Sequence, residues 1–421
     1  MKVAGIAAEY NPFHLGHQKQ IEYLKNELKA DYIVAAMSGD FVQRGTPALL
    51  PKHLRTEMAL MGGADLVLEL PVSVSTGSAE FFAKGAVSLL EGIGAVDLLC
   101  FGSEEGELSP FETASAILTE EPPAYQAVLK EQLKRGASFP AARQQALTAC
   151  LCGVSGAPAP EALRRFLSSP NNILGLEYCK ALREQNSSIQ PVTLLRDGSD
   201  YHEGRLQKGR APSASAVRAV FKEAAGGDPG KASPLLRESL AEYLPDAVCA
   251  LLSHSAAENS FLTEEDFDLL LHYCLLSMPP EEMCCCLDVS PDLAARIKNT
   301  LNQYRGFSQF TSLLKTREVT YTRIQRSLLH LLLKIREAAF PVPYARVLGF
   351  KKAAAPLLKE INSRSQIPVF TKLSRGELLL DQYGKKVLEE NTFVSNLYEA
   401  VLCKKQDRPF IHEYQKPVIM I

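Results

Sequence analysis

Two histidines, His14 and His17, lie about one helical turn apart just after the first apolar run of the chain, residues 3–8. A helix that begins here presents free backbone N–H groups and the positive end of its dipole, which together attract an anion. Gly16 lets a phosphate approach the backbone closely, and both imidazoles can donate hydrogen bonds to phosphate oxygens. The pattern therefore predicts a phosphate site. The alternative is a plain helix cap with surface histidines.

A second group of hydrogen-bond donors lies much further along the chain, in the string SASAVR. Ser213 and Ser215 can cap a helix and bind phosphate, and Arg218 adds positive charge near the same helical turn. Helix capping alone would also explain this element. Because the two elements stand at the two ends of one α/β unit, they predict a shared anion site more strongly together than separately.

The elements that must position these residues alternate between strands and helices. Continuous β-rich apolar runs, typical of strands covered on both faces of a parallel sheet, occupy residues 3–8, 32–37, 66–70, 97–101 and 191–195. Helical patterns occupy residues 17–29, 52–62, 78–91 and 170–184. This order predicts an α/β, Rossmann-like domain with a parallel sheet, over residues 1–225.

The character of the chain changes at residues 226–230, GGDPG, which we interpret as a linker. Thr263 and Asp266 approximate a capping box at the start of a helix, and further helices are expected over residues 292–304 and 322–339. We therefore expect residues 226–421 to form a second, mainly α-helical domain.

The composition excludes several classes of protein. The chain has 421 residues, of which 46% are hydrophobic and 22% charged, so it can bury a large core. The net charge of −2 excludes a polybasic protein. Neither a membrane span nor a signal peptide is recognisable, so a cytoplasmic protein without membrane contact is expected. The ten cysteines lack zinc-finger spacing and are expected to be free thiols.

The two donor elements resemble those of the nucleotidyltransferase branch of the H-x-G-H superfamily, which includes adenylyltransferases and class I aminoacyl-tRNA synthetases. Six strings make the resemblance closer, and they occur in the order AAEYNPFHLGHQ, MSGDFVQRG, DLVLELP, SPNNILGLEY, DYHE followed by SASAVR, and YTRIQRSLLHLLL. Together they resemble the bacterial tRNA(Met) cytidine acetate ligase family. The resemblance implies that ATP and acetate form acetyl-adenylate. It also implies transfer of the acetyl group to the wobble cytidine of elongator tRNA(Met), which gives N-acetylcytidine.

The same resemblance implies which residues act on ATP. The expected catalytic donors are His14, His17, Ser213, Ser215 and Arg218. The expected ATP-binding residues are Ala7, Ala8, Glu9, Tyr10, Asn11, Pro12, Phe13, His14, Leu15, Gly16, His17, Gln18, Lys19, Gln20, Gly102, Asn171, Arg196 and Asp197. Asp197 departs from the apolar residue often found there in the family, so we expect only its backbone to contribute. The alternatives are a helix cap for Asn171 and a surface salt bridge for Arg196.

Two charged residues, Asp40 and Arg44, follow the second expected strand. Asp40 is a candidate for orienting magnesium or the acceptor, and Arg44 for binding acetate or a phosphate. The alternative for both is turn chemistry with exposed charges. Glu69 lies in an apolar run, where a carboxylate needs a partner or exposure to solvent. Magnesium is expected on the β- and γ-phosphates, with no residue singled out as a direct protein ligand.

A basic region is expected to contact the RNA. Residues 301–350 contain eight Arg or Lys residues and two Glu residues, and His330 lies on the same expected helix face as several of them. A basic stripe with tyrosines nearby suits phosphate contacts and base stacking, whereas the alternative is a solvated helix face. The predicted tRNA-binding residues are Arg317, Arg323, Arg326 and Lys334.

Two other functions stay open at this point. One is an adenylyltransferase that acts on a small phosphorylated metabolite and needs no RNA. The other is a non-catalytic RNA-binding protein with a relic nucleotide pocket. The presence of His14, Gly16, His17 and Arg218 argues against the relic pocket.

Overall fold

The structure is a computed structural model that describes the chain except for residues 153–159, 197–205, 207–211, 226–228 and 317. Its centre is one sheet with the strand order β10-β8-β5-β2-β1-β6-β7, in which β9 also pairs with β8. The strands are β1 Val3–Ala8, β2 Tyr32–Ser38, β5 Leu66–Leu70, β6 Leu98–Ser103, β7 Gln190–Leu195, β8 Ala345–Phe350, β9 Val369–Phe370 and β10 Ile419–Met420.

The middle of the sheet is parallel, as the continuous apolar runs predicted. Strand β1 pairs in parallel with β2 on one side and with β6 on the other, so the chain crosses from one half of the sheet to the other beside β1. Ligands of open α/β sheets bind in the crevice at such a crossing, outside the carboxyl ends of the strands. The fold therefore brings the residues that follow β1 and β6 to one place.

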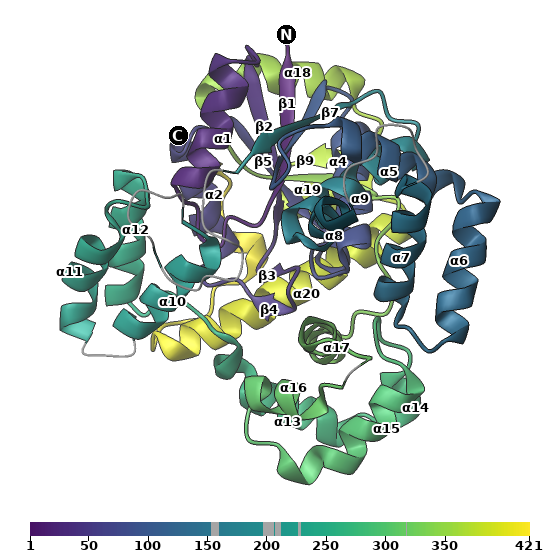
Figure 1. Ribbon diagram of the computed structural model, residues 1–421. Helices are drawn as coiled ribbons and strands as arrows, with labels where there is room; N and C mark the ends of the chain where they lie inside the picture. Colours follow the sequence, from purple (N-terminus) through teal and green to yellow (C-terminus); the bar gives the residue numbers. More distant parts are fainter. Residues whose placement is uncertain (153–159, 197–205, 207–211, 226–228, 317) are drawn as a thin grey trace.

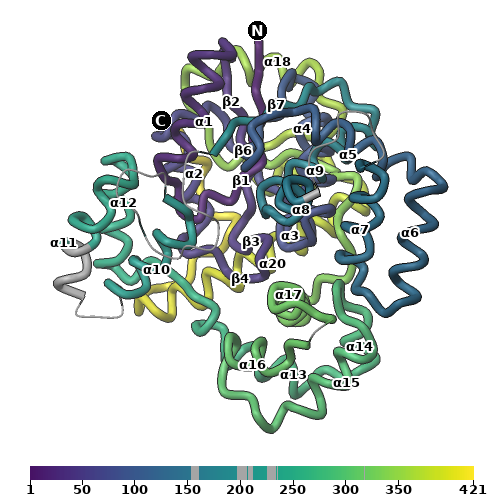
Figure 2. Tube along the Cα trace, viewed as in Figure 1, coloured from purple at the N-terminus to yellow at the C-terminus, as the bar shows by residue number. Residues whose placement is uncertain are grey.

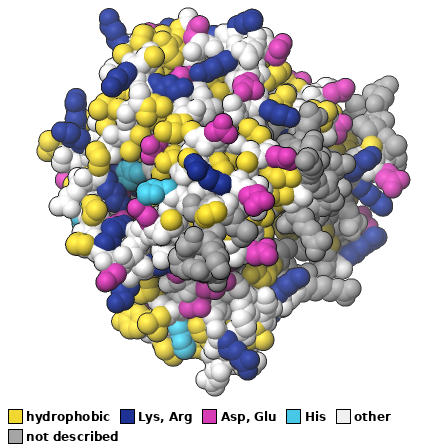
Figure 3. Space-filling view, turned by 90° about the vertical axis from the view of Figure 1, so that its left-hand side faces the viewer, with side chains coloured by type: hydrophobic (Ala, Val, Ile, Leu, Met, Phe, Trp, Pro, Cys, Tyr) yellow, Lys and Arg dark blue, Asp and Glu magenta, His cyan; other side chains and the backbone are white. Residues whose placement is uncertain are grey.

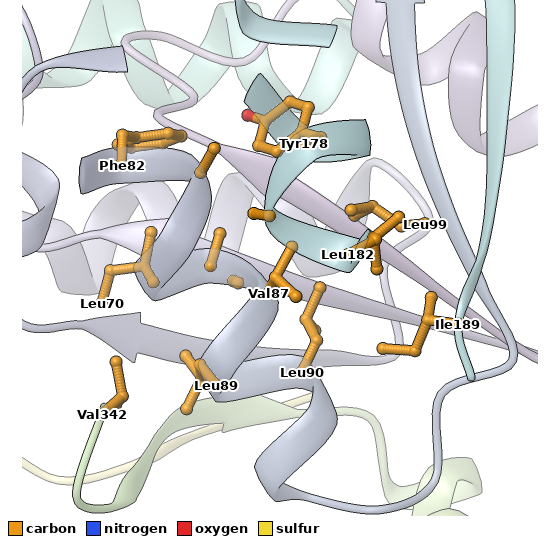
Figure 4. Close-up of a cluster of buried hydrophobic side chains, with 14 of the residues drawn as sticks. Leu70, Phe82, Val87, Leu89, Leu90, Leu99, Tyr178, Leu182, Ile189 and Val342 are labelled. Atoms are coloured by element: carbon orange, nitrogen blue, oxygen red, sulfur yellow. The ribbon is translucent and has the colours of Figure 1, made fainter. Parts of the chain in front are cut away.

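Helices cover both faces of the sheet (Figure 1). One face packs against α1 Leu15–Asn26, α2 Lys52–Met61, α10 Ala214–Ala225, α11 Pro229–Leu240 and α12 Asp246–Ala257. The other face packs against α4 Ala79–Gly92, α5 Ser109–Glu120, α7 Phe139–Cys152, α8 Pro160–Ser168 and α9 Pro170–Glu184, with α6 Pro123–Lys134 alongside α7. Figure 4 shows part of this second core, where Val87, Leu90 and Leu182 of the helices meet Leu99 of β6.

A helical lobe forms the lower part of the molecule in the view of Figure 2. Its helices are α13 Asp268–Ser277, α14 Pro280–Met283, α15 Pro291–Thr300, α16 Phe307–Leu314 and α17 Tyr321–Leu333. The core of the lobe also takes in Phe41 from the hairpin of β3 (Phe41–Val42) and β4 (Thr46–Pro47), and Tyr398 from α20 (Gln382–Lys405). The hairpin and α20 thus join the lobe to the sheet. None of the described helices is both long and apolar enough to cross a membrane.

The C-terminal part holds the main departures from expectation. The residues after 226 are mainly helical, as predicted, and Thr263 and Asp266 do form a capping box. However, β8 returns to the sheet and pairs antiparallel with β5, while β9 and β10 pair with β8, so the sheet is not confined to residues 1–225. The remaining helices there are α18 Ala355–Arg364 and α19 Leu373–Leu379, and α3 Val72–Ser75 follows β5. The domain boundary itself stays a prediction.

Candidate active site

A pocket lies at the carboxyl edge of the sheet beside β1, with an empty volume of about 1140 Å³ including its open mouth. This is enough room for a nucleotide. Its described lining comes from the ends of β1 and β6 and from α1, α4, α9, α10 and the turn of the β3–β4 hairpin. The lining residues are Ile6, Ala7, Ala8, Glu9, Tyr10, Asn11, His14, His17, Gln20, Gln43, Arg44, Phe82, Phe101, Gly102, Asn171, Leu174, Tyr178, Arg196, Ser213, Ala214, Ser215 and Arg218.

The two histidines form a capping box at the start of α1. The Nδ1 atom of His14 accepts a hydrogen bond from Gly16 N at 3.1 Å, and the Nδ1 atom of His17 accepts one from His14 N at 3.2 Å. Because a neutral imidazole accepts at one nitrogen and donates at the other, both Nε2 atoms carry the proton. The cap uses the Nδ1 side of each ring and leaves the Nε2–H side for other partners, so the helix cap and a phosphate site, which the sequence left as alternatives, are compatible with each other.

The environment keeps both rings neutral. Burial lowers the pKa of His14 well below its usual value, and His17, Arg196 and Arg218 lower it further. Burial, followed by the Arg196 charge, lowers the pKa of His17 to about 3. The rings stack with centroids 3.7 Å apart, an arrangement that two imidazolium ions would oppose by repulsion. The pair can therefore donate two Nε2–H groups without bringing charge.

The second donor element closes the same pocket from α10. The Oγ atom of Ser213 accepts a hydrogen bond from Ala216 N at 3.1 Å, which caps the helix. Arg218 donates from Nη1 to the carbonyl oxygen of Asn11 at 2.8 Å and from Nη2 to Ser215 Oγ at 3.1 Å. The guanidinium thus joins α10 to the loop after β1, so the two predicted donor elements do meet.

A polar network supports the other side of the pocket. Arg196 Nη1 donates to Asn171 Oδ1 at 3.1 Å, and Asn171 Nδ2 donates to Glu104 Oε1 at 2.6 Å. The backbone of Asn172 also donates to Glu104, at 3.0 Å, which holds the start of α9. Gly102 lies next to Arg196, because a Cβ there would be 3.1 Å from the Arg196 Cγ. Glu104 is thus a supporting residue that the sequence did not indicate.

The segment 7–20 is only partly exposed to the pocket. Pro12, Phe13, Leu15, Gly16, Gln18 and Lys19 are not among the lining residues. Phe13 is buried and its ring fills the space beside Gly62 of the α2 C-cap. Tyr10 adopts a left-handed backbone conformation, with φ of 44°, and places its ring edge-on to His17 at 4.9 Å. Strained backbone of this kind concentrates at functional sites.

Asp40 does not occupy the position that was expected of it. It is 5% exposed and does not line the pocket. Its Oδ1 atom accepts a hydrogen bond from Lys52 N at 2.9 Å, and its Oδ2 atom lies 3.6 Å from Lys52 Nζ. The carboxylate therefore caps α2 instead of facing a ligand. Arg44, from the turn between β3 and β4, does line the pocket, together with Gln43.

Glu69 has the partners that its buried position requires. Its carboxylate lies 2.6 Å from Lys52 Nζ and accepts a hydrogen bond from Arg346 Nη1 at 2.9 Å. Glu413 joins the same two cations, at 2.8 Å from Lys52 and 2.7 Å from Arg346. Although burial opposes charge on it, the Lys52 ammonium holds the pKa of Glu413 below its usual value. With Asp40, which also approaches Lys52, this buried cluster of charges ties the C-terminal segment to the sheet.

Arg55 is a further supporting residue that the sequence analysis missed. It is fully buried and donates to three carbonyl oxygens, those of Leu50 at 3.0 Å, Glu9 at 2.5 Å and Gly39. These carbonyls belong to three loops at the edge of the pocket. No local sequence pattern predicts that an arginine will bind carbonyl oxygens in the interior, because an arginine near the start of a helix usually faces solvent.

The predicted RNA-binding residues differ in their exposure to solvent. Arg323 and Lys334 are exposed at the two ends of α17. Arg326 instead forms an ion pair with Asp288, with Nε 3.0 Å from Oδ2, and its side chain is only 12% exposed. His330 is buried and its ring contacts Leu287 O and Thr76 O, each at 3.0–3.1 Å.

The expected single basic stripe is therefore interrupted, because the middle of α17 packs into the protein. Helix α17 also ends at Leu333, earlier than predicted, because Lys334 has a left-handed backbone with φ of 58°. Arg317 and Asp197 lie outside the described residues, as does most of the predicted linker.

The cysteines and metal ligands can be judged within the described part of the chain. All ten cysteines are free thiols, as predicted. Among the residues that are described, no three or more His, Cys, Asp or Glu side chains are grouped so as to hold a metal ion.

A neutral histidine pair at a helix start, with arginines around it in the crevice of a mostly parallel sheet, defines a nucleotide site of the H-x-G-H nucleotidyltransferase class. In agreement, the family described as HIGH Nucleotidyl Transferase matches residues 1–410. The tRNA(Met) cytidine acetate ligase of Acetivibrio thermocellus is 38% identical over 413 residues, 96% of either chain. That of Clostridium perfringens is 37% identical over 409 residues, covering 94% of this chain and 95% of its own. The chain therefore belongs to the tRNA(Met) cytidine acetate ligase family, as its motifs predicted.

Two solved structures agree with this assignment. The crystal structure of apo Thermotoga maritima TmcAL superposes with a TM-score of 0.91 over all of both chains, at 28% identity. The same enzyme bound with alpha-thio ATP gives a TM-score of 0.89 at 29% identity, and covers 100% of this chain and 99% of its own.

Proposed function

We propose that the protein uses ATP to activate acetate and then acetylates the wobble cytidine of elongator tRNA(Met). The observation that carries this proposal is the convergence of the histidine pair and Arg218 on one pocket. The names of the relatives support the acetate and tRNA(Met) substrates, and the Thermotoga enzyme bound with alpha-thio ATP supports ATP as the nucleotide.

In the first step an acetate oxygen attacks the α-phosphorus of ATP, pyrophosphate leaves and acetyl-adenylate forms. Negative charge spreads over the transferring group, so the enzyme acts by positioning and by electrostatic stabilisation. The Nε2–H groups of His14 and His17 supply neutral donors. Arg218 and Arg196 supply the positive charge.

Magnesium would be held mainly by the phosphates of the nucleotide and would neutralise part of their charge. The described lining of the pocket offers only one carboxylate, that of Glu9, which suits a metal held mainly by the substrate. His14, His17, Ser213 and Ser215 are then free to contact phosphate oxygens directly.

In the second step the exocyclic amine of the cytidine attacks the acetyl group, and AMP leaves. Single-stranded anticodon bases can be turned out of their loop to reach a pocket. Arg323 and Lys334 are the described candidates for contacts with the RNA backbone. On the face drawn in Figure 3, basic side chains alternate with acidic ones instead of forming one large patch.

The test is to incubate the purified protein with ATP, magnesium, labelled acetate and total bacterial tRNA, and to analyse the digested RNA by mass spectrometry. We expect labelled N-acetylcytidine in one tRNA, lost in His14→Ala and His17→Ala. Acetate-dependent release of pyrophosphate without labelled RNA would refute tRNA as the acetyl acceptor. If the protein binds ATP but neither releases pyrophosphate nor labels RNA, the non-catalytic protein with a relic pocket is favoured. Transfer of the adenylyl group to a phosphorylated metabolite would favour the adenylyltransferase.

A further inference from the structure

The second step of the proposed function requires a proton acceptor at the cytidine amine. When the N4 lone pair forms a bond to the acetyl carbonyl carbon, the bond from that carbon to the adenylate oxygen breaks and AMP leaves with the electron pair. One N4 proton must be given up to produce the neutral amide. A positioned side chain that accepts such a proton accelerates reactions of this kind by about 10²–10⁴-fold.

Most of the polar side chains in the pocket cannot accept this proton. The Nδ1 lone pairs of His14 and His17 already accept backbone N–H groups, and both Nε2 atoms carry hydrogen. Arg196 and Arg218 have donors only. The serines and amides that line the pocket are too weakly basic at neutral pH.

Glu9 is the one carboxylate among the described residues that line the pocket. It comes directly after β1 and is partly exposed. Its Oε1 atom accepts a hydrogen bond from Gln43 N at 2.9 Å, and its own carbonyl oxygen accepts one from Arg55 Nη1. Within the described part of the chain, no hydrogen bond to Oε2 is found, so the carboxylate is oriented by one oxygen and keeps the other for a ligand.

A carboxylate is also a group that recognises cytosine at the edge of the base that carries the N4 amino group. Carboxylate oxygens accept hydrogen bonds from the N4 amino group of cytosine, whereas uracil presents a carbonyl oxygen at the same position. A carboxylate close to polyphosphate would be unfavourable, so Glu9 is better matched to the base than to the nucleotide phosphates.

We propose that Glu9 accepts a hydrogen bond from the N4 amino group of the target cytidine and takes its proton as the acetyl group is transferred. This inference rests on the proposed function and adds a catalytic and base-selecting residue to it. The bound proton then passes from the Glu9 carboxyl group to solvent when the acetylated tRNA leaves.

The experiment separates the two steps in the full-length protein. Glu9→Gln keeps an oxygen that can accept the hydrogen bond from Gln43 N but removes the carboxylate that would take the N4 proton. Acetate-dependent exchange of pyrophosphate into ATP reports the first step, and a single turnover from preformed acetyl-adenylate to tRNA reports the second. We expect the transfer to slow by about 10²–10⁴-fold, clearly more than the exchange slows, and Glu9→Asp to restore part of the transfer.

Two results would overturn the inference while leaving the proposed function intact. One is a transfer rate in Glu9→Gln that equals the rate of the wild-type protein. The other is unchanged transfer together with a shifted magnesium dependence of the exchange reaction, which would make Glu9 a metal ligand. By contrast, a wild-type protein that never acetylates tRNA would refute the proposed function itself.

Discussion

Removing the ammonium group of Lys52 is expected to destabilise the protein much more than removing an exposed ammonium at the same distance from its partner. Lys52 has no solvent exposure, and its Nζ lies 2.6 Å from Glu69 Oε1. Lys386 Nζ lies 2.6 Å from Glu337 Oε1 as well, but these side chains are 61% and 68% exposed. The two ammonium groups therefore share the distance to one carboxylate but differ in burial, and Lys52 also has Glu413 and Asp40 as partners. Lys386→Met is the exposed control for Lys52→Met.

The magnitude follows from what each variant leaves behind. Lys52→Met leaves the carboxylates of Asp40, Glu69 and Glu413 buried, with Arg346 as the cation that touches Glu69 and Glu413. At least one buried negative charge is then uncompensated, and breaking a buried pair in this way costs about 3–5 kcal/mol of unfolding free energy. Lys386→Met breaks a solvated pair and costs less than about 1 kcal/mol.

Urea denaturation at neutral pH measures both variants against the wild type. Lys52→Met should shift the midpoint strongly to lower urea, and added salt should change this difference little, because buried charges are weakly screened. The small effect of Lys386→Met should disappear in high salt. Equal losses in the two variants would refute the argument that burial determines the strength of the Lys52 cluster.

Three further predictions concern the pocket and its support. Because the folded pKa of His17 is about 3, below its usual value, the unfolded chain takes up protons first as pH falls below about 6.5. The free energy of unfolding therefore falls as the pH falls toward 3, and urea denaturation should show a smaller fall over this range in His17→Asn than in the wild type. Gly45→Ala would place a Cβ 2.5 Å from Arg326 N and should cost about 1–3 kcal/mol more than Gly136→Ala, where φ is similar but nothing lies within 4 Å; equal midpoints would contradict this. Arg218→Met should weaken ATP binding about 10–100-fold by calorimetry, with Arg218→Lys recovering only part of the loss because lysine lacks the guanidinium fork.

The central fold could be predicted because its signals are local. Strands covered on both faces are continuously apolar, and helix starts carry their own caps, as at His14 and Thr263. Strand β8 was missed for the opposite reason. Its sequence, ARVLGF, carries a charged residue at its second position, and Glu69 and Glu413, far away in the sequence, neutralise Arg346 in the folded protein.

The pocket residues were easier to predict than the residues that support them. In an open parallel sheet, side chains that follow strand ends converge on one edge, so sequence position alone brings Gly102 and Arg196 near the histidine pair. The placement of Asp40, Arg55 and His330 instead depends on partners from other elements, which no spacing rule supplies.

The same contrast explains why Arg44 lines the pocket as expected whereas Asp40 does not. Asp40 precedes the short strand β3, Arg44 lies in the turn after it, and the two carry opposite charges, so either could have lined the pocket. The N-terminus of α2 attracts the Asp40 carboxylate, which accepts a hydrogen bond from Lys52 N. The β3–β4 turn instead places Arg44 in the pocket. Because a helix N-terminus and a site for anions each select the complementary charge, the tertiary positions of these two features decide which residue lines the pocket.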